Sequence, residues 1–289
     1  SVASRITVSP SYMITRYVET GHGNNVSIRT PINVSHYAGI KAEYVFDNTV
    51  INGLNMIEGT RMKIRYENYR GLTSPAESFD NLHIDLRNYK KVHRDIIFAT
   101  RLAFGRFGGR SRKDYMLGGM DNWIFNTKDR RDAPDSPIAV VSGRDNRDIL
   151  FNEFVTNLRG FNFNKLSGST YVLFNGELRF PIVKYFYRGP ITSNFFKNFQ
   201  FVGFADVGAA WTGKGPFSRQ NSLNTVPIGG GANPFRATVT NFKNPFLAGY
   251  GLGARTLLLG YYVKFDVAWG VEDYIVSSPK YYLTLGYDF

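Results

Sequence analysis

The sequence predicts an all-β fold, and more specifically a transmembrane antiparallel β-barrel, on three observations. Apolar and polar residues alternate in segment after segment, which is typical of strands with one face in apolar surroundings. No stretch keeps the i, i+3, i+4, i+7 spacing of an amphipathic helix through three turns. No apolar run approaches the roughly 18 residues that a membrane helix needs, so this chain would have to cross a bilayer with strands.

About ten strands are predicted along the chain, separated by turns rich in glycine. They are 4–15, 41–50, 61–70, 81–90, 95–105, 169–182, 199–211, 246–258, 261–270 and 280–289. Segment 16–40 is long enough to hold strands that the alternation does not reveal. Because no linker and no long internal repeat interrupts the chain, we expect one domain, 1–289.

The polar faces of these strands favour a hydrated lumen over a soluble surface. They mix both signs of charge, as a water-filled lumen tolerates, and the strands are long enough to cross a bilayer. Aromatic residues at strand ends, where a membrane interface favours them, are Trp211, Tyr261, Trp269 and Phe289. A soluble sandwich or a lipocalin-like barrel, with the apolar faces inside, is the alternative.

The last strand shows the alternation most clearly. Its apolar parity consists of Tyr281, Leu283, Leu285, Tyr287 and Phe289, and the opposite parity is mostly small or polar. We therefore expect these five side chains to face the membrane together, up to the final residue.

The alternation breaks between residues 108 and 169, a segment too long to be a passive turn. It carries apolar residues, among them Trp123, Phe125, Phe151 and Phe154, so it should pack against something. In a barrel, the available place is the lumen or its outer mouth.

Three motifs in and after this segment resemble the Omp85 superfamily, also called the bacterial surface antigen family. They are LRGF at 158–161, NGELRFP at 175–181 and FADVGAAW at 204–211, and the terminal Phe289 resembles the family's insertion signal. Three further stretches, YVFDNT, LGGMDNW and YYVKFDVAWGVED, are most similar to a Bacteroidota-type branch. The resemblance implies a barrel of about sixteen strands in the bacterial outer membrane. It also implies that this chain is the C-terminal part of a longer polypeptide.

The same motifs define a candidate site, which we call the loop-lock cluster. Strand parity places Glu177 and Asp206 on the inward face, where an arginine carried on the long segment would meet both. Its members are Arg159, Gly160, Phe161, Glu177, Phe204, Asp206 and Gly208. In this hypothesis Gly160 permits a sharp turn, and the Phe161 and Phe204 rings shield the ion pair from water. An ordinary ion pair in a polar lumen is the alternative.

The resemblance implies assembly, insertion or translocation of proteins at the outer membrane, with outer-membrane lipid, client proteins and lipoproteins as partners. The alternatives are a passive channel that favours anions and a docking platform for lipoproteins or surface proteins. We expect no enzyme, no cofactor and no metal, because the four histidines lack metal-ligand spacing and no GxSxG motif is present. Asp132, Asp135 and Asp145 could gather a cation, but a solvated surface is the favoured interpretation.

Overall fold

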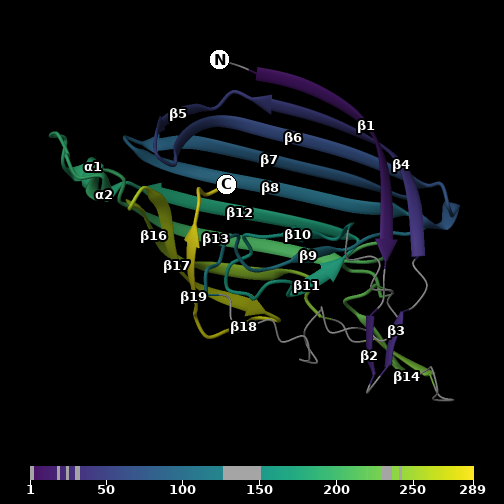
Figure 1. The fold of residues 1–289 in the computed structure, drawn as a ribbon. Coiled ribbons are helices and arrows are strands. Elements are labelled where there is room, and N and C mark those ends of the chain that lie inside the picture. The colour runs from purple at the N-terminus through teal and green to yellow at the C-terminus, as the bar shows by residue number, and fades with distance from the viewer. Residues whose placement is uncertain are drawn as a thin grey trace.

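A computed structural model describes residues 3–17, 20–23, 26–29, 33–125, 151–219, 221–229, 236–240 and 243–289. Its main element is one antiparallel sheet of 12 strands, which curves around three short strands (Figure 1). The all-β, antiparallel prediction is confirmed. Among the described residues, no helix combines the length and apolar character needed to cross a bilayer.

Ten strands of the sheet follow the ten predicted segments in order. They are β1 (Ala3–Tyr17), β4 (Asn33–Asp47), β6 (Met56–Gly71), β7 (Phe79–His93), β8 (Ile96–Gly109), β12 (Thr170–Phe180), β13 (Gln200–Trp211), β16 (Leu247–Leu258), β17 (Tyr261–Glu272) and β19 (Lys280–Leu285). Two short strands, β5 (Val50–Gly53) and β18 (Ile275–Val276), pair with β6 and β17. Consecutive long strands are neighbours throughout, as hairpin connections require.

The sheet is open rather than closed into a barrel. Its path starts at β1 and ends at β17, which carries β18 and β19, and no ladder joins β1 to β19 in the part of the chain that the structure describes. The two edges differ in length, since β1 has 15 residues and β19 has 6. Closure requires strand number and stagger to agree around the ring. In the described residues the sheet has 12 strands, so the predicted total of sixteen is not confirmed.

The two faces of the sheet differ in the opposite sense to those of a soluble protein, since apolar side chains lie on the outward face and charged ones on the inward face. Large apolar side chains cover the outward face; for example, Leu252 is 67% exposed and Leu178 is 47% exposed. Several charged side chains on the inward face are fully buried, including Arg179, Asp206 and Asp266 at 0% exposure. Period-two alternation produces this division most clearly in β12, β13, β16 and β17, whereas nearly all of β1 is exposed.

The predicted aromatic girdle is only partly present. Tyr261 is 65% exposed, and the Trp269 ring stacks on Tyr250 with 5.9 Å between centroids. Trp211 and Phe289 are instead buried, at 9% and 6% exposure. The backbone of Trp211 lies against Gly168 of the long segment, and Phe289 packs beside Tyr89 and Ile97, so strand position alone does not predict their surroundings.

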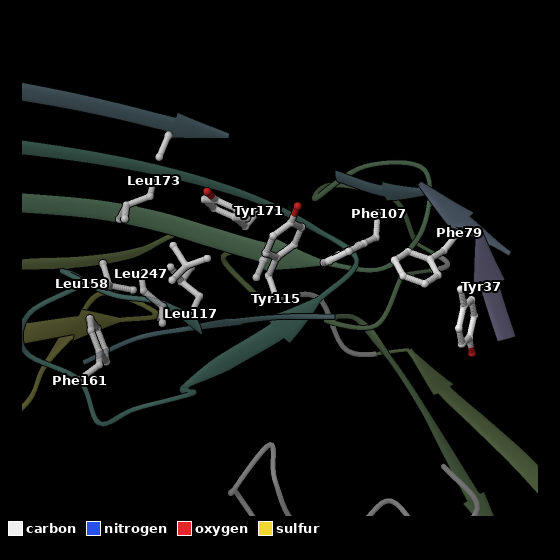
Figure 2. Close-up of a cluster of buried hydrophobic side chains, with 13 residues drawn as sticks. Tyr37, Phe79, Phe107, Tyr115, Leu117, Leu158, Phe161, Tyr171, Leu173 and Leu247 are labelled. Carbon is white, nitrogen blue, oxygen red and sulfur yellow. The ribbon is translucent and has the colours of Figure 1, made fainter. Parts of the chain in front are cut away.

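The described parts of segment 108–169 form a small sheet against the inward face. Its strands are β9 (Tyr115–Leu117), β10 (Glu153–Val155) and β11 (Leu166–Gly168), in the order β10-β9-β11. Their apolar side chains join the largest buried cluster, in which Tyr115, Leu117 and Leu158 lie near Leu173 of β12 and Leu247 of β16 (Figure 2).

The prediction that the apolar residues of the long segment pack against the rest of the protein is confirmed in part. Phe151 packs on Phe79 at 4.8 Å between ring centres, and Trp123 packs on Tyr282 at 4.6 Å. Phe125 and Phe154 remain more than 60% exposed, contrary to expectation.

The remaining elements lie at the two ends of the sheet. The hairpins β2 (Thr20–Gly23)/β3 (Val26–Arg29) and β14 (Thr225–Gly229)/β15 (Arg236–Thr240) extend from one end, and β2 and β3 are strands within 16–40 that alternation did not reveal. The helices α1 (Ile182–Phe186) and α2 (Asn194–Lys197) project from the opposite end (Figure 1). A 3-10 turn, η1 (Pro75–Glu77), links β6 to β7.

Candidate functional site

The tip of the long segment, residues 158–161, brings one arginine onto two carboxylates. Arg159 Nε donates to Asp206 Oδ2 over 2.7 Å, and Nη2 donates to Oδ1 over 2.8 Å. Nη1 donates to Glu177 Oε1 over 2.7 Å. The guanidinium carbon lies 3.6 Å from the centre of the Phe204 ring. The planar guanidinium fork makes these contacts together, which a lysine ammonium cannot do.

Strand pairing explains why the two carboxylates converge. In the ladder of β12 and β13, Glu177 pairs with Phe204 and Asn175 pairs with Asp206. Paired residues share a face, as do residues two apart along a strand, so both carboxylates and the Phe204 ring point inward. Asn175 donates to Asp206 over 2.8 Å, which holds that carboxylate in place.

Burial decides how much this contact contributes. The side chains of Arg159, Glu177 and Asp206 are at most 1% exposed. Burial alone lowers the pKa of Arg159, but the neighbouring carboxylates outweigh it and hold that pKa well above its ordinary value. A buried pair of this kind is weak evidence for net stability, whereas removal of one partner leaves an uncompensated charge and costs about 3–5 kcal/mol.

The backbone beside Arg159 is held by the last strand. Gly160 has a φ of +92°, in the left-handed region that favours glycine. Its N–H donates to the Tyr282 hydroxyl over 2.9 Å, and that hydroxyl donates to the Phe161 carbonyl over 2.7 Å. The tip is therefore tied to β19 as well as to β12 and β13.

A glycine on β16 permits the close approach of this tip. A side chain at Gly249 would collide with the Arg159 carbonyl oxygen. The backbone of 158–161 consequently lies directly against β16, where any larger residue would push it away.

The other two members of the cluster have packing roles. Phe161 does not stack on the guanidinium; its ring lies in the buried cluster with Leu158 and Leu247 (Figure 2). At Gly208 a Cβ would meet Leu117 at 3.1 Å and Leu173 at 3.2 Å, so this glycine leaves room for the apolar part of the loop.

A second anchor of the long segment was not predicted from the sequence. Glu153 on β10 accepts two hydrogen bonds from Arg65 on β6, over 2.5 and 2.7 Å, and one from Asn81 on β7 over 2.8 Å. Tyr115 on β9 donates to the Asn81 side chain. Arg65 lies on a predicted inward face, but no local pattern marks Glu153 as its partner.

A third buried network joins the C-terminal residues to the sheet. Arg255 Nη1 bonds Asp266 Oδ1 at 2.6 Å and its Nε bonds Asp288 Oδ2 at 3.0 Å. Asn55, in the β5–β6 turn, donates to Asp288 over 2.8 Å. Arg179 donates to both Glu177 and the Phe289 carbonyl. Glu177 thus belongs to two networks, because it accepts from Arg159 on one oxygen and from Arg179 on the other.

The predicted outward set of the last strand needs a correction. Tyr281 and Tyr287 are exposed, and Leu283 and Leu285 are partly exposed, as the parity requires. Phe289 instead packs inward against Tyr89, Ile97 and other side chains. The strand ends at Leu285 and Gly286 takes a φ of +112°, so the alternation no longer governs the residues beyond it.

No group of three or more histidine, aspartate and glutamate side chains that could hold a metal occurs among the described residues. Asp132, Asp135 and Asp145 lie outside those residues. No family model matches the sequence, and no curated protein matches it significantly.

Proposed function

We propose that this chain is part of an outer-membrane barrel of the Omp85 type, which assembles, inserts or translocates proteins. The contact of Arg159 with Glu177 and Asp206 carries the proposal. It joins the three motifs on which the resemblance rests, over distances of 2.7–2.8 Å, in a fully buried cluster.

The distribution of apolar surface supports a membrane location. The outward face exposes large apolar side chains, which lipid would cover, while the inward face holds ion pairs. A soluble sandwich would bury the apolar faces and is disfavoured for that reason. The location proposed is the bacterial outer membrane.

The unequal edges support a mechanism based on strand addition. A long β1 edge and a short β19 edge leave backbone donors and acceptors that an incoming strand can pair with. The loop tip is bonded to Tyr282 of β19, so the lock and this edge are mechanically connected. No covalent bond changes in such a mechanism.

The passive-channel alternative is less favoured because β9, β10 and β11 pack on the inward face, where an open pore would need space. Anion-selective conductance in a planar bilayer, without any effect on other proteins, would support that alternative.

The proposal is tested in the native cell by exchanging the gene for an Arg159→Ala variant. We expect a broad fall in the abundance of outer-membrane β-barrel proteins, with inner-membrane proteins unchanged, in quantitative mass spectrometry of membrane fractions. Arg106→Ala is the matched control, because Arg106 is exposed and has no ion-pair partner among the described residues. Unchanged levels of barrel proteins in the Arg159→Ala cells, with the variant itself present at normal abundance, would contradict the proposal.

A further inference from the structure

The connection between β12 and β13 exposes aromatic rings at one end of the sheet. Residues 181–199 contain α1 and α2, both of which project beyond the strands (Figure 1). Phe186 is 74% exposed, and Tyr187 and Phe196 are each 54% exposed. Ring contacts such as Tyr185–Phe186 at 5.2 Å and Phe195–Phe196 at 5.2 Å hold these side chains beside one another.

Cationic side chains surround a hollow next to these rings. The hollow has a volume of about 740 Å³ and is lined by residues of the end of β7, of the β7–β8 turn and of 181–199. Its five cations are Lys91, Arg94, Lys184, Arg188 and Lys197, and its one carboxylate is Asp95. We call these five cations, together with Phe186, Tyr187, Phe195 and Phe196, the basic-aromatic surface.

Three of the five cations lack a carboxylate partner among the described residues, although the Arg94 guanidinium lies 5.2 Å from the centre of the Tyr185 ring. Lys184 lies 3.3 Å from Asp95, and Lys91 lies 3.8 Å from Glu58. Arg94, Arg188 and Lys197 have no carboxylate within 4.0 Å among the residues that the structure describes. Like charges gathered around one hollow repel one another, and a bound anion would relieve that repulsion.

The combination of unpaired cations and exposed rings selects the kind of anion. Guanidinium and ammonium groups bind phosphate well, but a free phosphate would leave the phenylalanine rings in water. Segments that carry lysine and arginine beside phenylalanine or tryptophan are favoured at the boundary between lipid headgroups and acyl chains. An anionic phospholipid would contact both the cations and the aromatic rings, with its phosphate in the hollow and its chains against the rings.

If the proposed function holds, the basic-aromatic surface lies at the end of the sheet that meets a phospholipid leaflet of the membrane. The strands at this end are joined by the short turns β7–β8 and β16–β17 and by 181–199, whereas β8 and β13 end at the opposite end, where the longer connections 110–169 and 212–246 begin. Outer-membrane barrels have short periplasmic turns and longer extracellular loops. This end therefore faces the periplasm.

We propose that the basic-aromatic surface binds the phosphate of an anionic phospholipid headgroup at the periplasmic membrane interface. Backbone anchoring supports a built site, since Thr256 of β16 donates to the Phe195 carbonyl over 2.9 Å and so holds α2 against the sheet.

The test is native mass spectrometry of the full chain in detergent, titrated with dioleoyl phosphatidylglycerol or dioleoyl phosphatidylcholine. We expect phosphatidylglycerol to be retained in preference to phosphatidylcholine. The triple variant R94Q/R188Q/K197Q should bind phosphatidylglycerol on the order of 100-fold more weakly, since each cation near an anionic lipid contributes roughly a factor of 5. F186S/F196S should also weaken retention while leaving the charge unchanged.

The matched control is R110Q/R112Q/K214Q, which removes equal charge from exposed residues at the opposite end. Equal losses in the two triple variants, equal retention of the two lipids, or displacement of the lipid by millimolar inorganic phosphate at constant ionic strength would each overturn the proposal. The circular dichroism spectrum identifies a variant that fails to fold, in which case the single variant R188Q replaces it. Lipid binding in detergent does not require client assembly. If the proposed function is wrong, only the cell experiment with Arg159→Ala gives a negative result, and lipid binding is unaffected.

Discussion

At the scale of single residues, Arg159 makes the contact on which the candidate site depends. Its guanidinium reaches Asp206 with two donors and Glu177 with a third, in a site that excludes water. The chemistry therefore requires both a positive charge and a planar set of donors.

Substitution of Arg159 separates these two requirements. We expect Arg159→Ala to lower the free energy of unfolding by about 3–5 kcal/mol, because two buried carboxylates lose their partner. Arg159→Lys keeps the charge but should recover less than half of that loss. Urea unfolding followed by heat-modifiable gel migration measures both, with Arg106→Ala as the control. A lysine variant as stable as the wild type would show that charge alone holds the loop tip.

Gly249 is a residue at which one methyl group should have a large effect. Gly249→Ala places a Cβ against the Arg159 carbonyl, and we expect a loss of about 1–3 kcal/mol in stability. Gly203→Ala is the matched control on the neighbouring strand, because its Cβ would meet nothing closer than Leu252 at 3.8 Å. If urea midpoints for the two variants coincide, the close approach of the loop tip to β16 is not important for stability.

At the scale of elements, the long segment is held at two separate places. Arg159 and Tyr282 anchor its tip near β13 and β19, and Glu153 anchors β10 to β6 and β7. Two anchors on strands far apart in the sheet restrain the segment more than either alone, because the free length of chain between fixed points is shorter.

The bond between the tip and β19 is testable through one hydroxyl. Tyr282→Phe leaves the Gly160 N–H and the Phe161 carbonyl without their buried partner, which should cost about 1–3 kcal/mol. Amide exchange of 158–161 and of β19 should accelerate together, as followed by hydrogen-exchange mass spectrometry. Tyr261→Phe, at a 65% exposed residue, should change neither. Faster exchange in 158–161 with β19 unaffected would show that tip and strand are not coupled.

At the scale of the whole molecule, the open sheet is the property with the widest consequences. Among the strands that the structure describes, β1 pairs only with β4, and all of its described side chains except Met13 and Thr15 are exposed. Unpaired strand edges invite pairing with another strand.

Hydrogen exchange of the full chain in detergent tests this property. We expect about half of the β1 amides, those that point away from β4, to exchange far faster than the amides of β7, which is paired on both sides. Uniform protection of β1 would mean that a further strand covers its edge.

Local sequence pattern determined the strands and their faces. A period of two is a property of the extended backbone itself, so the ten long strands and the inward positions of Glu177, Asp206 and Asp266 follow from parity. The same reasoning missed β2 and β3, which have only four residues each and are too short for a convincing alternation, and it extended the last strand too far, to Phe289.

Only the tertiary structure decided which residues meet across the interior. The partnerships of Glu153 with Arg65, of Tyr282 with Gly160 and of Arg255 with Asp288 join residues 88, 122 and 33 positions apart. It also decided that Phe289 packs inward and that the sheet stays open. Such contacts depend on curvature, strand order and the path of the loop, which are set by the whole assembly of strands and leave no local pattern in the sequence.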